Sequence, residues 1–406
     1  MSGHLHFCRV CNGKNFESAI DLGAQPWGNN FLRRDQLGKE TKYPLHVVWC
    51  SHCKTAQLDY TVPKEVMFSD HTYLSGTTSS LSSHLERIEA MVNSRYAKDQ
   101  PEKWVLDIGS NDGTLLSHFK NLGWEVFGVE SSRSTAELAV SKGIKTLNSF
   151  YNLETQKLIC RKFDIINASG VFFHLEELHS VTEAIKIALK PQGVFIVQFL
   201  YMKRIMENNA FDQIYHEHLL YYTLHSLRFL LAKYNLDIFD AAIDPIHGGS
   251  MVAHVGHRGA FTERPRLTAL LAEEEASGCN DLRAYKALAT SMVELKCREL
   301  DLLAGWNAKG KRIFGMGAPV KGNTLLNYLG VDTGYIEVLV ERNALRRGLF
   351  APGSHIPVVI EDEFTEIPDV YYVLAWNYKD EILARYESLI RRPTHFHFPV
   401  NPGNEE

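Results

Sequence analysis

The stretch KWVLDIGSNDGTLLSHFKNLGWEVFGVESS, residues 103–132, predicts a strand, a glycine-containing turn, a helix and a second strand in succession. Its first apolar run, residues 104–108, has the length and composition of a buried parallel strand. The chain then turns at residues 109–113, has helical spacing at 114–122, and enters a second strand at 125–129 that ends at Glu130. The stretch therefore predicts one β–α–β unit.

The same alternation continues along the chain. A strand (163–168), a helix (176–189), a turn (190–193) and another strand (194–199) follow in that order. Strands that alternate with helices predict an α/β fold with a parallel, doubly wound sheet. Ligands of such sheets bind at the carboxyl ends of the strands, which here lie near Asp107, Gly109, Glu130 and Asn167.

The turn at residues 109–113 differs from the glycine pattern that binds dinucleotides. It reads GxxxG rather than GxGxxG. Asn111 and Asp112 add hydrogen-bond acceptors, which suit a cationic ligand without phosphate better than a pyrophosphate. Glu130 lies about 20 residues after the first glycine, where an acidic side chain binds ribose hydroxyls. A purely structural β–α–β unit is the alternative to a ligand site.

Composition narrows the class of protein. The chain has 406 residues, which fits two or three domains, and 45% of them are hydrophobic. Its net charge of −5 gives no general attraction for nucleic acid. We find neither a signal peptide nor an apolar run of about 18 residues, so we expect no membrane span. Seven cysteines, an odd count, favour a reducing, cytoplasmic setting.

Two CxxC pairs near the N-terminus predict a metal site. Cys8 and Cys11 form one pair, and Cys50 and Cys53 form the other. Each spacing lets two thiolates of one turn reach the same tetrahedral ion, and zinc is the natural occupant of a four-sulfur site. Four cysteines leave no open position for a substrate, so we expect the zinc to be structural. Four free thiols or one redox pair are the alternatives.

The segment FDQIYHEHLLYYTLHSL, residues 211–227, concentrates tyrosine, histidine and glutamate after the strand at 194–199. Its position lets it overhang the carboxyl ends of the strands. His216 and His218 stand at i and i+2 rather than at i and i+4, so they do not share one helical face and a metal grip is disfavoured. Proton transfer is the better interpretation, because histidine has a pKa suited to a general base.

A third part of the chain repeats the design of strand, glycine turn and helix. Residues 267–306 have helical periodicity and link it to the second part. Residues 311–330, KRIFGMGAPVKGNTLLNYLG, carry Lys321 in their turn, and the strand at 336–343 ends near Glu341. A helix N-terminus with a lysine suits a diphosphate, whereas a domain that only braces its neighbour is the alternative. We therefore divide the chain into residues 1–72, 73–266 and 267–406.

Several motifs together resemble known enzymes. VLDIGSNDG resembles the cofactor loop of class I S-adenosylmethionine-dependent methyltransferases, with Glu130 as the ribose-binding acid. The CxxC pairs, SNDGTLL, YHEHLLYYTLHSL, HGGS and GAPVKGNTLLNY resemble the sugar C-methyltransferase family. The resemblance implies S-adenosylmethionine and a structural zinc as cofactors. It also implies methylation of a nucleotide-linked 4-keto-deoxysugar, typically at C3, through an enolate.

The resemblance also implies roles for individual residues. His218 matches the general base of the family, and Tyr215, Glu217, His174 and Tyr73 match its other active-site residues. Glu217 would orient or tune the imidazole of His218. The expected contacts of the cofactor are Asp107, Gly109, Asn111, Asp112, Glu130 and Asn167, and those of the substrate are His247, Lys321 and Asn323.

Three other functions fit parts of the sequence. A sugar O-methyltransferase could use the same histidine to deprotonate a hydroxyl group. An NAD-dependent nucleotide-sugar oxidoreductase would use the third part, but the absence of GxGxxG disfavours it. A non-catalytic zinc-ribbon binding protein is disfavoured by the dense tyrosine and histidine cluster. For the leading function we expect a monomer that binds a small nucleotide-sugar, without nucleic acid or membrane as a partner.

Overall fold

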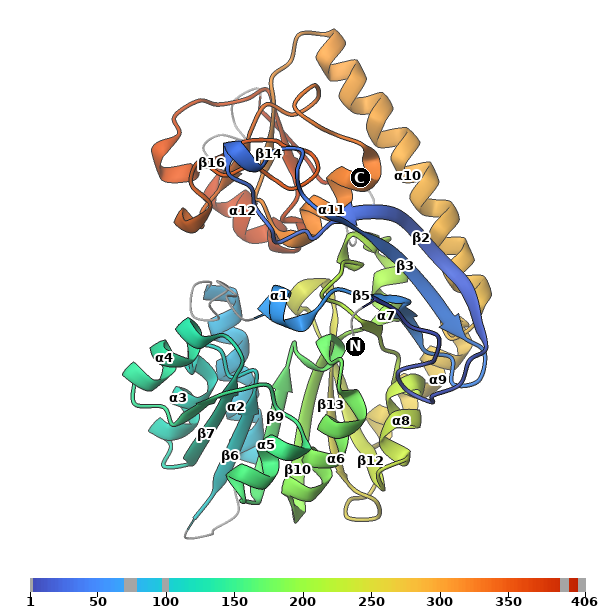
Figure 1. Ribbon diagram of the computed structural model, residues 1–406, viewed down its shortest axis with the longest axis vertical. Coiled ribbons are helices and arrows are strands. Elements are labelled where there is room, and N and C mark those ends of the chain that lie inside the picture. The colour runs from blue at the N-terminus through green and yellow to red at the C-terminus, as the bar shows by residue number, and fades with distance from the viewer. Residues whose placement is uncertain (1–2, 69–78, 97–101, 388–393, 401–406) are drawn as a thin grey trace.

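The computed structural model describes residues 3–68, 79–96, 102–387 and 394–400 (Figure 1). A lower lobe holds the central domain and an upper lobe holds the C-terminal domain. Strands β2 and β3 and the long helix α10 run along one side of the molecule and join the two lobes. The N-terminal part therefore lies against both lobes rather than at one end of the molecule.

The central domain is built on a seven-stranded sheet. Its five parallel strands, β6 to β10, run side by side, and β13 is antiparallel to both of its neighbours. The predicted α/β, doubly wound sheet is thus confirmed, with an antiparallel strand added. The strands in spatial order are β12 (Leu236–Asp244), β13 (Ser250–His257), β10 (Leu189–Leu200), β9 (Phe163–Ser169), β6 (Trp104–Ile108), β7 (Glu125–Glu130) and β8 (Thr146–Asn148).

The helices predicted at 114–122 and 176–189 form within two residues of the expected ends. The turn predicted at 190–193 lies instead inside β10, where pairing with β9 is interrupted between Leu189 and Val194. Pro191 lies in this interruption, and proline has no N–H to contribute to a sheet. The helices of this domain are α2 (Ser79–Tyr96), α3 (Thr114–Asn121), α4 (Arg133–Ser141), α5 (Leu153–Ile159), α6 (Leu178–Ala188), α7 (Met202–Glu207) and α8 (Leu224–Ala232).

The N-terminal sheet is completed by a strand from the central domain. Strand β11 (Leu220–Tyr221), which belongs to the segment 211–227, pairs with β4, so that Leu220 lies opposite Gln57. This joins the histidine-rich segment to the N-terminal sheet. The other elements of this part are β1 (Gly3–His4), β2 (Phe16–Pro26), β3 (Lys42–Cys50), β4 (Ala56–Leu58), β5 (Tyr60–Thr61) and α1 (Lys64–Phe68).

The C-terminal domain repeats the strand order of the central domain. Its five strands are all parallel and lie in the order β16–β15–β14–β17–β18, as β8–β7–β6–β9–β10 do. The predicted second α/β domain is confirmed. Its elements are β14 (Ile313–Met316), α11 (Val320–Leu329), β15 (Leu339–Glu341), β16 (Val358–Ile360), β17 (Val370–Val373), α12 (Lys379–Arg385) and β18 (His395–His397).

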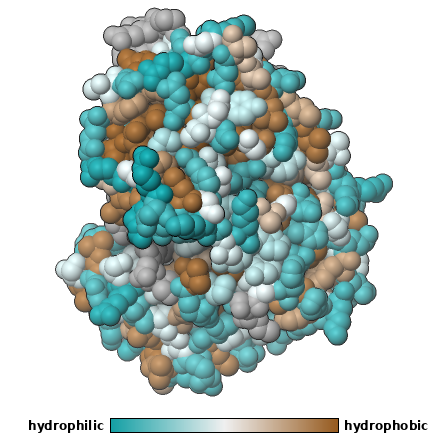
Figure 2. All heavy atoms as spheres, turned by 45° about the horizontal axis from the view of Figure 1, so that its top comes forward, coloured by the Kyte–Doolittle hydropathy of each residue, from teal (hydrophilic) through white to brown (hydrophobic). Residues whose placement is uncertain are grey.

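Two helices, α9 (Pro265–Ser277) and α10 (Leu282–Ala308), occupy the region expected to link the second and third parts. Helix α10 packs on β2, and one hydrophobic core extends through all three parts, from Val10 through Phe195 to Tyr372. On the face shown in Figure 2, hydrophobic side chains lie in patches between hydrophilic ones. None of the helices in the described ranges has the length and apolar character to cross a membrane.

Candidate active site and metal centre

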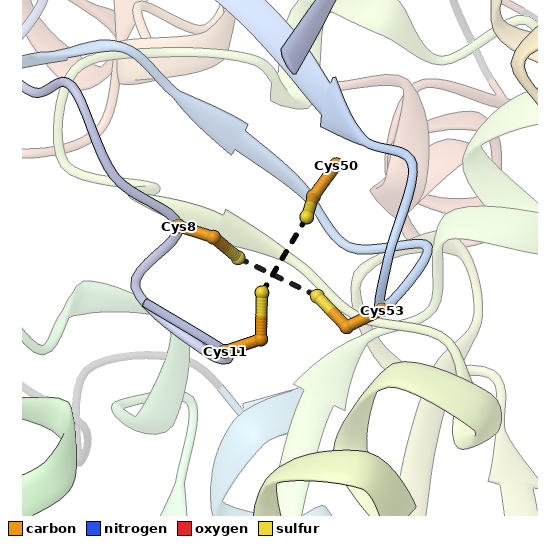
Figure 3. A group of neighbouring side chains, drawn as sticks. All are labelled: Cys8, Cys11, Cys50 and Cys53. Atoms are coloured by element: carbon orange, nitrogen blue, oxygen red, sulfur yellow. Dashed lines mark hydrogen bonds between the residues drawn. The ribbon is translucent and has the colours of Figure 1, made fainter. Parts of the chain in front are cut away.

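The four predicted zinc ligands come together at one point (Figure 3). Cys8 Sγ lies 3.4 Å from Cys53 Sγ, and Cys11 Sγ lies 3.5 Å from Cys50 Sγ. All four sulfur atoms lie within 4.8 Å of one another. A tetrahedral zinc with Zn–S bonds of about 2.3 Å requires sulfur–sulfur separations of about 3.8 Å. The donor set and its geometry therefore fit a zinc ion.

The separations also exclude disulfide bonds, which need sulfur atoms about 2.05 Å apart. Backbone N–H groups support the thiolates, because Val10 N donates to Cys8 Sγ (3.4 Å) and Gly13 N donates to Cys11 Sγ (3.3 Å). His46 and His52 are not members of the group of ligand atoms. The centre is closed by four cysteines and hence structural.

A cavity of about 880 Å³ lies where the carboxyl ends of the two parallel sheets face each other. Its wall includes Gly109 and Glu130 from the central domain, Gly317 and Glu341 from the C-terminal domain, and His218 from the histidine-rich segment. This volume is within the range of pockets that hold small-molecule ligands. The cavity brings together the turns that the sequence singled out in both α/β domains.

One side of the cavity is formed by the predicted cofactor turn. Glu130 ends β7, and its two carboxylate oxygens accept hydrogen bonds from Asn111 N (Oε2, 2.9 Å) and Ser132 N (Oε1, 2.7 Å). Gly109 has φ of +70°, and Val171 lies where a Cβ would stand, so only glycine fits the turn. Burial raises the pKa of Glu130. The turn thus holds an acidic side chain in a fixed position at the cavity wall.

Three of the predicted cofactor contacts do not line the cavity. Asp107 accepts a hydrogen bond from Asn167 Nδ2 (2.7 Å) beneath the turn, and burial raises the pKa of Asp107 to about 7. Asp112 pairs with Lys142 (2.8 Å) and accepts a hydrogen bond from Thr114 Oγ1 (2.7 Å) at the start of α3. These side chains support the turn from behind.

Two histidines of the predicted catalytic set each use Nδ1 for a hydrogen bond with a backbone carbonyl group. His218 Nδ1 lies 2.7 Å from Gln213 O, and His174 Nδ1 lies 2.6 Å from Glu217 O. A carbonyl only accepts, so each Nδ1 carries a proton and donates it. Burial, with His174 nearby, lowers the pKa of His218 well below its usual value. His218 is therefore neutral, and its Nε2 carries the lone pair.

Tyr215 and Glu217, two further members of the predicted catalytic set, differ in their contacts with His218. The Tyr215 ring packs on the imidazole, with 3.7 Å between ring centroids. Among the described residues, the Glu217 side chain makes no hydrogen bond to His218; its Oε1 accepts one from Trp27 Nε1 (2.7 Å), so the expected orienting contact is not found, and a tuning role stays a prediction. Backbone carbonyl groups do the orienting. Tyr73, the remaining predicted member, lies outside the described residues.

The predicted substrate contacts divide into two groups. Lys321 and His247 line the cavity. The Lys321 ammonium lies 3.5 Å from the centre of the Trp376 ring, and burial lowers its pKa to about 7. Asn323 does not line the cavity: it is fully buried, and its Nδ2 donates to Gly28 O (2.7 Å). Asn323 therefore joins two parts of the chain rather than facing a ligand.

Glu341 is a residue of the wall that the sequence analysis did not select. It ends β15, and its oxygens accept hydrogen bonds from Ala318 N (Oε2, 2.8 Å) and Asn343 N (Oε1, 2.8 Å). Glu130 has the same two kinds of partner, one in the glycine turn and one two residues further along the chain. The signal was present in the sequence, since both acids end the strand that follows a glycine turn.

Comparisons with known proteins cover nearly the whole length of the chain. Residues 8–68 match a family model for a zinc binding domain, residues 82–241 one for a methyltransferase domain, and residues 245–401 one for a C-methyltransferase C-terminal domain. The chain is 30% identical over 399 residues to the C-methyltransferase NovU of Streptomyces niveus, covering 97% of this chain and 95% of that protein.

Two similar solved structures each cover less than half of the chain. One is the magnesium protoporphyrin IX methyltransferase of Synechocystis PCC 6803 with bound SAM, with a TM-score of 0.34, 14% identity, and coverage of 43% of this chain and 79% of that chain. Another is the PH0226 protein of Pyrococcus horikoshii, with a TM-score of 0.35, 17% identity, and coverage of 46% and 95%.

Replacement of one zinc ligand should destabilise the protein. We expect Cys50→Ser to lose most of its zinc and to unfold at a lower temperature, because zinc supplies on the order of 10 kcal/mol to small zinc modules. Elemental analysis and thermal unfolding measure both effects. Cys297→Ser, at an exposed cysteine, is the control and should keep its zinc. Less than a tenth of an equivalent of metal in wild-type protein never exposed to chelator would contradict the assignment.

Removal of the Glu130 carboxylate should weaken cofactor binding. We expect Glu130→Ala to raise the Kd for S-adenosylmethionine by roughly 10-fold or more, the worth of a hydrogen bond to a charged group. Calorimetric titration measures the Kd. Glu137→Ala, at an exposed position on α4, is the matched control and should bind normally. An unchanged Kd in Glu130→Ala would remove Glu130 from the cofactor site.

Proposed function

We propose, since this chain belongs to the C-methyltransferase family, that it transfers a methyl group from S-adenosylmethionine to a carbon next to the ketone of a nucleotide-linked 4-keto-deoxysugar. C3 is the proposed carbon. The observation that carries the proposal is the neutral His218 in the wall of the cavity between the two α/β domains. A neutral imidazole with a free lone pair is the base that such a carbon requires.

The reaction divides among the groups of the cavity. S-adenosylmethionine supplies an electrophilic methyl group when it is bound. His218 Nε2 takes the proton from the carbon, and the electrons of the C–H bond move to the ketone oxygen as an enolate. Hydrogen-bond donors near that oxygen stabilise the charge, and Tyr215, His174 and Glu217 line the same region of the wall. The walls exclude water and hold the carbon in line with the methyl group.

We assign the nucleotide part of the substrate to the C-terminal domain. Glu341 stands at the end of β15 with the hydrogen-bond pattern of Glu130, which supports contact with a sugar hydroxyl of the nucleoside. Lys321, on the first turn of α11, supports contact with the diphosphate. His247 is proposed to face the deoxysugar. Asn323, which is buried against Gly28, is left out of this assignment.

Removal of the proposed base should stop proton abstraction. We expect His218→Ala to bind S-adenosylmethionine normally but to lose turnover by roughly 10²-fold or more, the usual worth of a positioned acid–base group. It should also lose solvent deuterium exchange at the acidic carbon of the keto-sugar, which NMR measures without the methyl donor. NMR of the methylated product separates a C-methyl from an O-methyl group and tests the reaction class.

His225→Ala is the matched control, because this histidine of the same segment is exposed on α8 and does not line the cavity. It should exchange and methylate as the wild type does. If exchange persists in His218→Ala while methylation is lost, another residue is the base, and His174 is the next candidate.

Glu341 should affect the substrate and not the cofactor. We expect Glu341→Gln to raise the KM for the nucleotide-sugar by roughly 10-fold, because a hydrogen bond to a charged group is lost. The Kd for S-adenosylmethionine should be unchanged. Glu337→Gln is the control, since Glu337 pairs with Arg312 at a half-exposed position. Equal KM values for Glu341→Gln and the wild type would contradict the assignment.

A further inference from the structure

The N-terminal zinc module contributes a side chain to the active-site cluster. Trp27 immediately follows β2, and its Nε1–H donates to Glu217 Oε1 at 2.7 Å. Glu217 is 5% exposed and lines the cavity. Among the described residues, Glu217 Oε2 makes no hydrogen bond. One oxygen of the carboxyl group is therefore fixed by the zinc module, and the other is left for a ligand.

The position of Trp27 is itself fixed by the C-terminal domain. The next residue, Gly28, accepts a hydrogen bond from the buried Asn323 Nδ2 at 2.7 Å. A Cβ at Gly28 would stand 3.1 Å from Val320 O, so the chain passes close to α11. Trp27 is thus held on two sides. Its neighbour Gly28 contacts the C-terminal domain, and its indole contacts Glu217 of the central domain.

The indole N–H favours one position for a proton on Glu217. Tryptophan donates and does not accept, so the oxygen that it contacts must act as an acceptor. The carbonyl oxygen of a protonated carboxyl group is a better acceptor than its hydroxyl oxygen, so the contact favours the proton on Oε2. Glu217 in its acid form then has a donor directed away from Trp27, in a residue of the cavity wall.

We propose that Trp27 is a positioning residue, which holds the Glu217 carboxyl group so that Oε2–H donates a hydrogen bond to the ketone oxygen of the sugar as it becomes an enolate. The proposal rests on the proposed function. It adds the zinc module to the parts of the protein that act on the substrate, through a single indole.

The charges around Glu217 agree with this role. Burial raises the pKa of Glu217 to about 7, and the Trp27 hydrogen bond and the Arg346 guanidinium oppose the shift. The other titratable groups of the cluster are the side chains of His218, His174 and Tyr215, and His218 is neutral near pH 7. Since the Trp27 hydrogen bond stabilises the ionised carboxylate, its loss raises the pKa of Glu217 further. The acid form then persists to higher pH.

The test compares Trp27→Phe with Trp49→Phe. Trp49 lies on β3 of the N-terminal sheet and is buried, whereas Trp27 follows β2 and is partly buried. The Trp49 Nε1–H donates to Asn280 O (3.1 Å) and not to a residue of the cavity wall. We expect Trp27→Phe to keep its zinc and to lower kcat roughly 10-fold through misplacement of Glu217. The proposed role requires the acid form of Glu217, so kcat should fall as the pH rises through the pKa of Glu217. In Trp27→Phe this fall should occur at higher pH than in the wild type. Trp49→Phe should leave kcat and its pH dependence unchanged.

A second measurement does not depend on turnover. Infrared titration of the substrate-free protein follows the Glu217 carboxyl band, identified as the band that disappears in Glu217→Gln. The midpoint should lie near pH 7 in the wild type and higher in Trp27→Phe. An unmoved midpoint, or an unchanged kcat and pH dependence, overturns the role of Trp27. Absence of methylation by the wild type, with the midpoint shifted, contradicts the proposed function instead.

Discussion

The pairing of β11 with β4 is the interaction on which the geometry of the cavity depends. Leu219 N donates to Phe173 O (2.9 Å), and Leu58 N donates to Leu219 O (3.0 Å), so the residue after His218 is held between the turn Phe172–His174 of the central domain and the N-terminal sheet. Strand β3 ends at Cys50, and β4 begins soon after Cys53. The zinc ligands therefore fix the turn that presents β4. Metal, strand pairing and imidazole form one continuous series of contacts.

The two α/β domains hold an acidic side chain in the same way at the sheet edges that face each other. In each, an acid at the end of the second strand accepts N–H groups from the glycine turn and from the second residue after the acid itself. Backbone donors fix the orientation of each carboxylate, and Glu341 Oε2 in addition pairs with the Arg346 guanidinium (3.2 Å). Because the sheets face each other, both acids reach one cavity. Two ligands, one bound at each acid, can then meet at the centre of the cavity, where the histidines of the cluster lie.

The features that could be predicted from the sequence are those that a short local pattern determines. The strand Trp104–Ile108, the cysteine ligands and the position of Glu130 each follow from spacing within a short stretch. The sequence did not predict the partners of Glu217 and Asn323. Trp27 is 190 residues from Glu217, and Gly28 is 295 residues from Asn323. No periodicity encodes such contacts, because they arise only when the three parts pack together. The orienting contact expected between Glu217 and His218 is therefore not found among the described residues, although Glu217 lies in the cavity wall as expected.

Burial in the cavity wall favours the neutral forms of His218 and Glu217. Burial lowers the pKa of His218 and raises that of Glu217 to about 7, since a low-dielectric wall disfavours charge. The same environment thus gives an unprotonated base and a protonatable acid side by side. The proposed removal of a proton next to a ketone would use this pair, because the base must be free while a donor meets the developing oxygen charge. Without the surrounding walls, water would return both groups to their ordinary pKa values. The packing of three domains around one cavity is therefore part of the chemistry.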